Sequence, residues 1–218
     1  MYPRFTVRLG TQDLQVAQEV MRQNEYRLPG NFSPEDVILD VGAHIGCFAL
    51  SCLGRGAGLV VCLEPNPDNQ ELLRENLAPF KDRVTILPLA LWEATEGLAY
   101  LKRKGPAFTA MGHCLSSGYG EMVPRIGLAE LLKMYPKVRL LKLDCEGGEW
   151  PSLFGVMDLS AVQEIVGELH HQMRLDCWPA KWNVDNVKPL LAAHGFETEI
   201  AAGAMPEMTS NFFARRAA

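Results

Sequence analysis

The segment LLKLDCEGGEW (140–150) places three carboxylates directly after an apolar run: Asp144, Glu146 and Glu149. The apolar run predicts a buried strand, and buried carboxylates are costly unless they are paired, hydrogen-bonded or used. A strand turns residues i and i+2 to the same face, so Lys142 and Asp144 should point the same way. Carboxylates gathered at a strand end have the chemistry to accept protons, bind hydroxyl groups or hold a cation.

Other apolar segments also end in polar, ionisable residues. The segments are VILDV (37–41), LVVCLE (59–64) and EIVGELH (164–170). They bring Asp40, Glu64, Glu168 and His170 to strand ends. His170 titrates in the range that suits proton transfer near neutral pH, so it is our candidate for a general base. Asp144 and Glu168 complete the predicted catalytic group.

The elements that must position these residues alternate between strand and helix. A helical pattern over 11–26 and a Pro/Gly-rich loop precede the first strand. Further strands are predicted at 84–91 and 138–144, a hairpin partner at 97–103, and a surface loop at 104–125. Helices are predicted at 45–53, 66–77, 128–135 and 184–195, and closing strands at 196–201 and 210–216. This alternation predicts an α/β fold with a mostly parallel sheet, which binds ligands beyond the carboxyl ends of its strands.

Composition bounds the function classes. The chain has 218 residues, 48% of them apolar, which suits one compact domain (37–218) behind an N-terminal helical cover segment (1–36). A net charge of −5 argues against nucleic acid or an anionic membrane as partner. No apolar run has the length of a membrane span, and the first residues lack a signal-peptide core, so we expect a cytoplasmic protein. The six cysteines lack CxxC spacing, which indicates reduced thiols.

The turn DVGAHIG (40–46) indicates a cofactor site. Gly42 permits a tight turn and a close backbone approach to a ligand, and Gly46 permits close packing at the helix start. Glu64, at the next strand end, suits both hydroxyls of an adenosine ribose. The GxGxxG fingerprint of dinucleotide sites is absent, and Asp40 in the turn would repel a pyrophosphate but attract a cation. The pattern therefore favours S-adenosylmethionine, with S-adenosylhomocysteine as product, over NAD.

We expect the cofactor to contact residues of four regions. They are Tyr26 upstream, Asp40, Gly42, Ala43 and Gly46 in the first turn, Glu64, Pro65 and Asn66 after the second strand, and Leu91 and Asp144 at later strand ends. Tyr26 and its neighbour Arg27 are candidates for holding the cofactor's carboxylate. Lys142 should be buried and paired with Asp40 or Asp144.

Four motifs together give the chain a resemblance to a known family. VILDVGAHIG, VCLEPNPDNQELLRENL, LLKLDCEGGEW and EIVGELHH resemble the corresponding motifs of FkbM-type methyltransferases, although His44 stands where Asn is more usual. The resemblance implies a Rossmann-like class I methyltransferase fold with a seven-stranded sheet. It also implies S-adenosylmethionine-dependent O-methylation of a small-molecule hydroxyl, on a sugar or a natural-product scaffold. Segments 104–125 and 170–183 would then recognise the acceptor.

The sequence is compatible with three interpretations of the site. The first, which we favour, is an O-methyltransferase without metal. The second is an O-methyltransferase using Mg²⁺ held by Asp144, Glu168 and a neighbour, since hard oxygen ligands suit that ion. The third is a non-catalytic cofactor-binding partner protein. Within 140–150 we expect Asp144 to serve the chemistry, Glu146 to hold the turn through backbone N–H groups or Lys142, and Glu149 to favour the positive end of a helix. The oligomeric state is not predicted.

Overall fold

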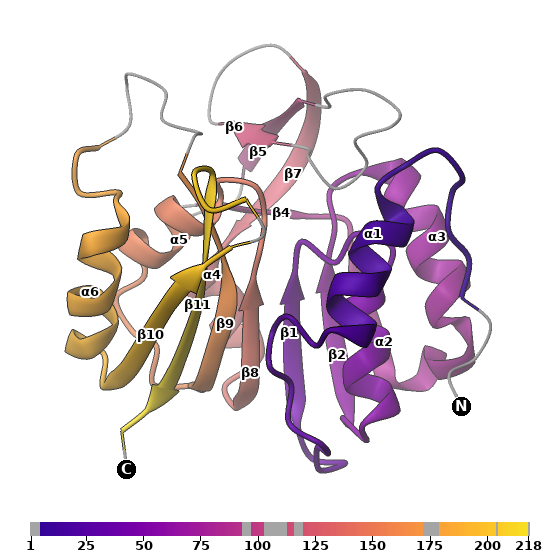
Figure 1. The fold of residues 1–218 in the computed structure, drawn as a ribbon, viewed down its shortest axis with the longest axis horizontal. Coiled ribbons are helices and arrows are strands. Elements are labelled where there is room, and N and C mark those ends of the chain that lie inside the picture. The colour runs from indigo at the N-terminus through magenta and orange to yellow at the C-terminus, as the bar shows by residue number, and fades with distance from the viewer. Residues whose placement is uncertain are drawn as a thin grey trace.

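A central sheet of seven strands organises the protein (Figure 1). The computed structural model describes residues 5–92, 97–102, 113–115, 120–171, 179–203 and 205–217. The strand order is β10-β11-β9-β8-β1-β2-β3, and only β11 in this sheet runs antiparallel to its neighbours. The strands are β1 (Val37–Val41), β2 (Leu59–Leu63), β3 (Val84–Leu87), β8 (Val138–Leu143), β9 (Val162–His170), β10 (Phe196–Ala202) and β11 (Thr209–Arg216). The predicted mostly parallel, Rossmann-like α/β fold is confirmed.

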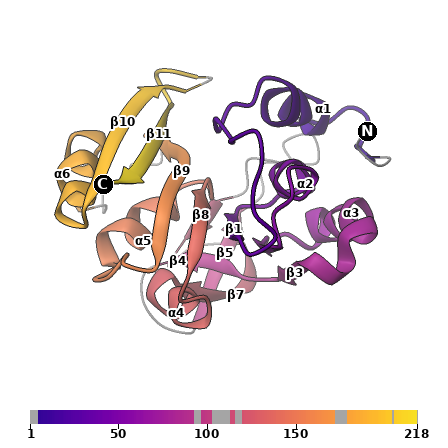
Figure 2. The ribbon, with the colours of Figure 1, turned by 90° about the horizontal axis from the view of Figure 1, so that it is seen from below.

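Helices cover both faces of this sheet (Figure 2). One face carries α1 (Asp13–Ala17), its π-helical continuation η1 (Gln18–Arg22), α2 (Cys47–Gly54) and α3 (Pro67–Leu77). The other carries α4 (Leu128–Met134), α5 (Glu149–Gly155) and α6 (Val187–Ala193). Short 3₁₀ turns, η2 (Ala78–Arg83) and η3 (Val184–Asn186), follow α3 and precede α6. Among the described residues, no helix is long and apolar enough to cross a membrane.

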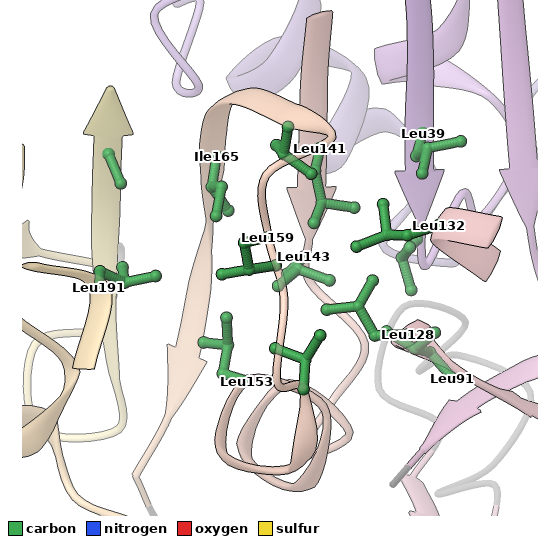
Figure 3. Packing of buried hydrophobic residues seen from close by; sticks show 14 of the residues in the cluster. Leu39, Leu91, Leu128, Leu132, Leu141, Leu143, Leu153, Leu159, Ile165 and Leu191 are labelled. Atoms are coloured by element: carbon green, nitrogen blue, oxygen red, sulfur yellow. The ribbon is translucent and has the colours of Figure 1, made fainter. Parts of the chain in front are cut away.

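The period-2 alternation of the strands divides the core in two. Leu39, Leu141 and Ile165 face α4, α5 and α6, where they meet Leu128 and Leu153 (Figure 3). Their sequence neighbours turn to the opposite face and pack under α2 and α3. Lys142 follows the second set, so it points toward the N-terminal helices. Because the strands bury residues on both faces, a slip by one residue would turn each set to the opposite face and would carry Lys142 away from the N-terminal helices.

The structure contains a second, four-stranded sheet that the sequence did not predict. It has the order β4-β7-β5-β6 and contains β4 (Ala90–Trp92), β5 (Gly97–Lys102), β6 (His113–Leu115) and β7 (Glu121–Gly127). The strand predicted at 84–91, with an irregular end at Pro88, is confirmed over Val84–Leu87, but the chain leaves the main sheet after Leu87. Pro88 has no N–H to continue the ladder, and the chain enters the second sheet at Ala90.

The predicted hairpin partner and surface loop also differ from the structure. Residues 97–102 form a strand as expected, but β5 pairs with β6 and β7. The segment predicted as a loop over 104–125 contributes β6 and most of β7, and its remaining residues, 104–112 and 116–119, lie outside the described residues. In Figure 1 this sheet lies toward the ends at which the β1 and β2 arrows point.

The turn from β1 into α2 is held by glycines. Gly46 begins α2 with a φ of 95°, and a Cβ there would lie 3.0 Å from Leu73, so the predicted close packing is confirmed. Gly42 has a φ of 78°, and a Cβ there would lie 1.8 Å from the carbonyl oxygen of Asp144. The backbone that approaches Gly42 so closely is that of the β8 end.

Gly42→Ala should therefore destabilise the fold more than the same change at a matched glycine. Gly10 has a similar φ of 75°, but a Cβ there would meet nothing within 4 Å, so Gly10→Ala should cost only about 1–2 kcal/mol of left-handed strain. Gly42→Ala adds a clash with backbone, and we expect a total loss above about 3 kcal/mol. Urea unfolding of both variants measures the difference, and equal losses would contradict the close approach.

Candidate active site

A buried ammonium lies between the ends of β1 and β8. Lys142 is 4% exposed, and its Nζ lies 3.3 Å from Asp40 Oδ1 and 3.5 Å from Asp144 Oδ2. Nζ also donates to the carbonyl oxygens of Gly42 at 2.8 Å and Val41 at 3.4 Å. Burial opposes the charge, but Asp40 and Asp144 outweigh it and raise the pKa of Lys142, so the side chain stays protonated. The prediction that Lys142 is buried and paired is confirmed, with both carboxylates as partners.

Asp40 does not stand in the turn, where the sequence placed it. It lies inside β1, opposite Lys142 of β8 in the strand register, and is fully buried. Burial raises the pKa of Asp40, and the ammonium of Lys142 limits the rise. The carboxylate therefore faces Lys142 from within the sheet.

Tyr26 ties the N-terminal segment to the same group. Its hydroxyl donates to Asp144 Oδ2 at 2.7 Å, and its ring meets Phe48 edge to face with centroids 5.4 Å apart. Arg27 is directed elsewhere. Its guanidinium forms two 2.9 Å hydrogen bonds with Glu199 of β10, and it stacks 3.8 Å above Phe213. Arg27 is thus already engaged at the far strands.

The structure brings the three predicted catalytic side chains together. His170 Nε2 lies 3.6 Å from Glu168 Oε2 and 3.9 Å from Asp144 Oδ1. One ligand atom from each of these residues lies within 4.8 Å of the others, a spacing that a metal ion could bridge. Glu146 Oε1 is also 3.6 Å from Nε2. The convergence follows from topology, because β8 and β9 are parallel neighbours whose carboxyl ends meet.

Burial and charge shift two of these groups in the same direction. Burial and the nearby Asp144 carboxylate raise the pKa of Glu168 to about 7. Burial opposes the His170 imidazolium, but the carboxylates of Glu149 and Glu146 favour it more, and the pKa of His170 is raised well above its ordinary value. At neutral pH the imidazolium therefore holds its proton, while Glu168 is poised between its two forms.

Glu149 differs from its predicted role. It does begin α5, but it is fully buried, and it accepts the N–H groups of Gly147 and His170 at 2.9 Å each. Glu149 therefore fastens the turn preceding α5, and the role predicted for Glu146 in the same turn stays a prediction. Glu146 has a φ of 55° and Gly147 a φ of 105°, which turn the chain sharply enough to direct the first helical side chain back toward β9.

Glu64 lies at the β2 end with its carboxylate held by backbone. Oε2 accepts the N–H of His44 and Oε1 that of Asn66, both at 2.8 Å. Burial raises the pKa of Glu64, and these donors limit the rise. Pro65 and Asn66 follow it into the α3 cap, where Asn66 accepts the Asp68 N–H as predicted.

The two remaining predicted cofactor residues, Ala43 and Leu91, are both buried. Ala43 is buried in the β1–α2 turn, and its N–H donates to Leu63 O at 3.0 Å. Leu91 belongs to β4 of the second sheet and is buried in the core, with its carbonyl oxygen near Gly148. Of the predicted acceptor segment 170–183, residues 172–178 lie outside the described residues.

Two residues near Glu168 and Asp144, namely Asn211 and Glu25, were not identified from the sequence. Asn211 of β11 lies opposite Glu168 in the register, and its Nδ2 donates to Glu25 Oε1 at 3.3 Å. Burial raises the pKa of Glu25, the Asn211 bond offsets part of the rise, and Asp144 adds to it. The sequence signal was weak, since Asn211 is a polar residue inside a closing strand and Glu25 stands in a helical pattern.

Comparison with known proteins finds a matching family and similar proteins. The family described as the methyltransferase FkbM domain matches residues 40–198. The chain belongs to the FkbM methyltransferase family. It is 29% identical over 163 residues to the hexuronic acid methyltransferase AglP of Haloferax volcanii, covering 72% of this chain and 64% of that protein. It is 25% identical over 248 residues to the AMB antimetabolite synthetase AmbE of Pseudomonas aeruginosa, covering 90% of this chain but 11% of that protein.

Solved structures agree on the fold. A crystal structure of methyltransferase FkbM from Methylobacillus flagellatus KT superposes with a TM-score of 0.59 and 15% sequence identity, covering 90% of this chain and 47% of that one. The chain thus spans less than two thirds of the length of each of these three proteins.

Lys142→Met tests the buried ion pair. Removing the ammonium leaves Asp40 charged without a partner in the interior, and we expect the free energy of unfolding at pH 7 to fall by about 3–5 kcal/mol. The double variant Asp40→Asn with Lys142→Met should recover much of this loss, because no unpaired charge remains at that position. Urea denaturation of the three proteins measures both effects, and a single variant as stable as wild type would contradict the pairing.

Proposed function

We propose that this protein is an S-adenosylmethionine-dependent O-methyltransferase that acts on a hydroxyl group of a small molecule such as a sugar or natural-product scaffold. The observation that carries the proposal is the convergence of Asp144, Glu168 and His170 beside the β1–α2 turn. The names of the two relatives, a hexuronic acid methyltransferase and an antimetabolite synthetase, support a sugar or a natural product as the acceptor class.

The residues at the β2 end fit the proposed cofactor. Both oxygens of Glu64 are oriented by backbone N–H groups, and the Asn69 side chain adds a third hydrogen bond to the carboxylate. A carboxylate has about four lone-pair sites, so one remains that suits a ribose hydroxyl. Gly42, Ala43 and Gly46 supply the turn beside it. When bound, S-adenosylmethionine supplies a methyl group on a positively charged sulfur. The carboxylate of Asp144, which follows β8 beside the β1–α2 turn, suits that charge.

One residue of the group Asp144, Glu168 and His170 should accept the proton of the acceptor hydroxyl. An alcohol attacks well only as its proton leaves, so a base must stand within reach. Sequence reasoning favoured His170, but the raised pKa of His170 makes its imidazolium a poor acceptor at neutral pH. With a pKa raised to about 7, Glu168 is the better base, and we assign the proton to it. Tyr26 and Lys142 fix Asp144, and His170 balances the negative charge around Glu168.

Cofactor binding gives the first test. Calorimetry should detect binding of S-adenosylhomocysteine and none of NAD. Glu64→Gln should weaken S-adenosylhomocysteine by about 1–3 kcal/mol, because a charge-assisted acceptor is lost. Glu71→Gln is the matched control, since Glu71 is an exposed acid of α3, and it should bind as wild type does. Equal affinity of the two variants would remove Glu64 from the ribose.

Acceptor chemistry gives the second part of this test. Wild-type protein is incubated with methyl-labelled S-adenosylmethionine and a panel of hexuronic acids, neutral sugars and hydroxylated natural products. Mass spectrometry then locates the transferred methyl group. Label on oxygen supports the proposal, whereas label only on nitrogen or carbon overturns O-methylation.

A metal-assisted version of the reaction is the second candidate, because the ligand atoms of Asp144, Glu168 and His170 lie within 4.8 Å of one another. We favour the metal-free reading, since the imidazolium of His170 and the raised pKa of Glu168 already reduce the negative charge. Dialysis against EDTA should therefore leave turnover unchanged, and Mn²⁺ should show no tight site by electron paramagnetic resonance. Activity lost on chelation and restored by Mg²⁺ would establish the metal-assisted reaction instead.

A further inference from the structure

We propose that Glu149 is the positioning residue of the site: its buried carboxylate holds the His170 ring so that Nε2 faces Asp144 and Glu168. The catalytic consequence rests on the proposed function, whereas the geometry can be tested without turnover. No motif of the sequence pointed to this role, because Glu149 was expected to serve only the helix end.

The hydrogen bonds of Glu149 fix the proton on His170. Oε1 lies 2.9 Å from His170 Nδ1 and also accepts the His170 backbone N–H at 2.9 Å. As a carboxylate, Glu149 can only accept hydrogen bonds. Nδ1 must therefore carry a proton directed at Oε1, whichever charge the ring has. Nε2 then projects from the opposite side of the ring, toward Glu168 Oε2, Glu146 Oε1 and Asp144 Oδ1.

Two anchors on one oxygen restrict the ring. Because Oε1 binds both the backbone and the ring of His170, a ring flip would break the Nδ1 bond inside a buried site. The next residue adds a tether, since Trp150 Nε1 donates to the carbonyl oxygen of His170 at 2.9 Å. The start of α5 thus holds the end of β9 through both the N–H and the C=O of His170.

The second oxygen of Glu149 binds the loop 144–148, which precedes α5. Oε2 accepts the Gly147 N–H at 2.9 Å and lies 3.7 Å from Cys145 Sγ. Every one of these partners is a donor, so the position requires two accepting oxygens. A glutamine offers one oxygen and an NH₂ group, which would oppose a donor and leave it unpaired. Aspartate keeps two acceptors but is one methylene shorter.

The test begins with unmutated protein. Long-range ¹H–¹⁵N spectra at neutral pH should show one histidine whose Nδ1 proton exchanges slowly with water. His170→Gln removes that resonance and so assigns it. In Glu149→Gln the Nδ1 proton should exchange rapidly, while S-adenosylhomocysteine affinity stays within about twofold of wild type. Asp185→Asn, which removes an exposed acid from the first turn of η3, is the control and should leave the His170 resonances unchanged.

Turnover then tests the consequence, with an acceptor found in the panel above. Glu149→Gln should lower kcat by about a hundredfold, with partial rescue by Glu149→Asp. Added to His170→Gln, it should cause no further loss, because Glu149 acts through the ring. An Nδ1 without a slowly exchanging proton in wild type, or an unchanged His170 signal in a folded Glu149→Gln, would overturn the proposal. Correct spectra without any methyl transfer would instead count against the proposed function alone.

Discussion

The structure depends on one buried positive charge. Lys142 lies in the central strand β8, where an ammonium survives only with partners close enough to replace water. Its partners come from β1, from the turn after β1 and from the end of β8. Satisfying this charge therefore fixes the relative positions of three backbone segments. Asp144 is both a partner of Lys142 and the acceptor of the Tyr26 hydroxyl, so the same charge also draws the N-terminal segment over the sheet.

Glu149 has the complementary position on the other side of Asp144. Lys142 gathers acceptors from β1 and β8, whereas Glu149 gathers donors from the 144–148 loop and from β9. The acids that line the site lie between a buried cation and a buried anion, each satisfied by backbone. Lys142 and Glu149 are both buried charged groups, and each has hydrogen-bond partners that offset its loss of water. Asp144 and Glu168 can therefore stay partly accessible.

The sequence predicted the parts of the fold that local pattern controls. Short apolar runs predicted β1, β2, β8 and β9, and the Asn66–Pro67 pair predicted the start of α3. It also predicted that the strand-end acids converge, since parallel strands share an edge. It could not predict the second sheet, whose pairing joins segments far apart in the chain. Nor could it predict that Glu149 is buried, because its position depends on left-handed backbone at both Glu146 and Gly147. A left-handed conformation is not expected at Glu146, which is not a glycine.

The β1–α2 turn, which we expect to bind the cofactor, is in direct backbone contact with Asp144, which we expect to serve the chemistry. Gly42 lies so close to the Asp144 carbonyl that no Cβ fits between them, and its own carbonyl accepts from Lys142. Its N–H donates to Leu63, one residue before Glu64. A shift of the turn would therefore move Asp144 and Glu64 with it. Methyl transfer needs donor and acceptor aligned within a fraction of an ångström, and a shared backbone contact meets that need without a separate clamp. Gly42, whose contact with the cofactor stays a prediction, therefore also joins the turn to Asp144 through the backbone of the protein itself.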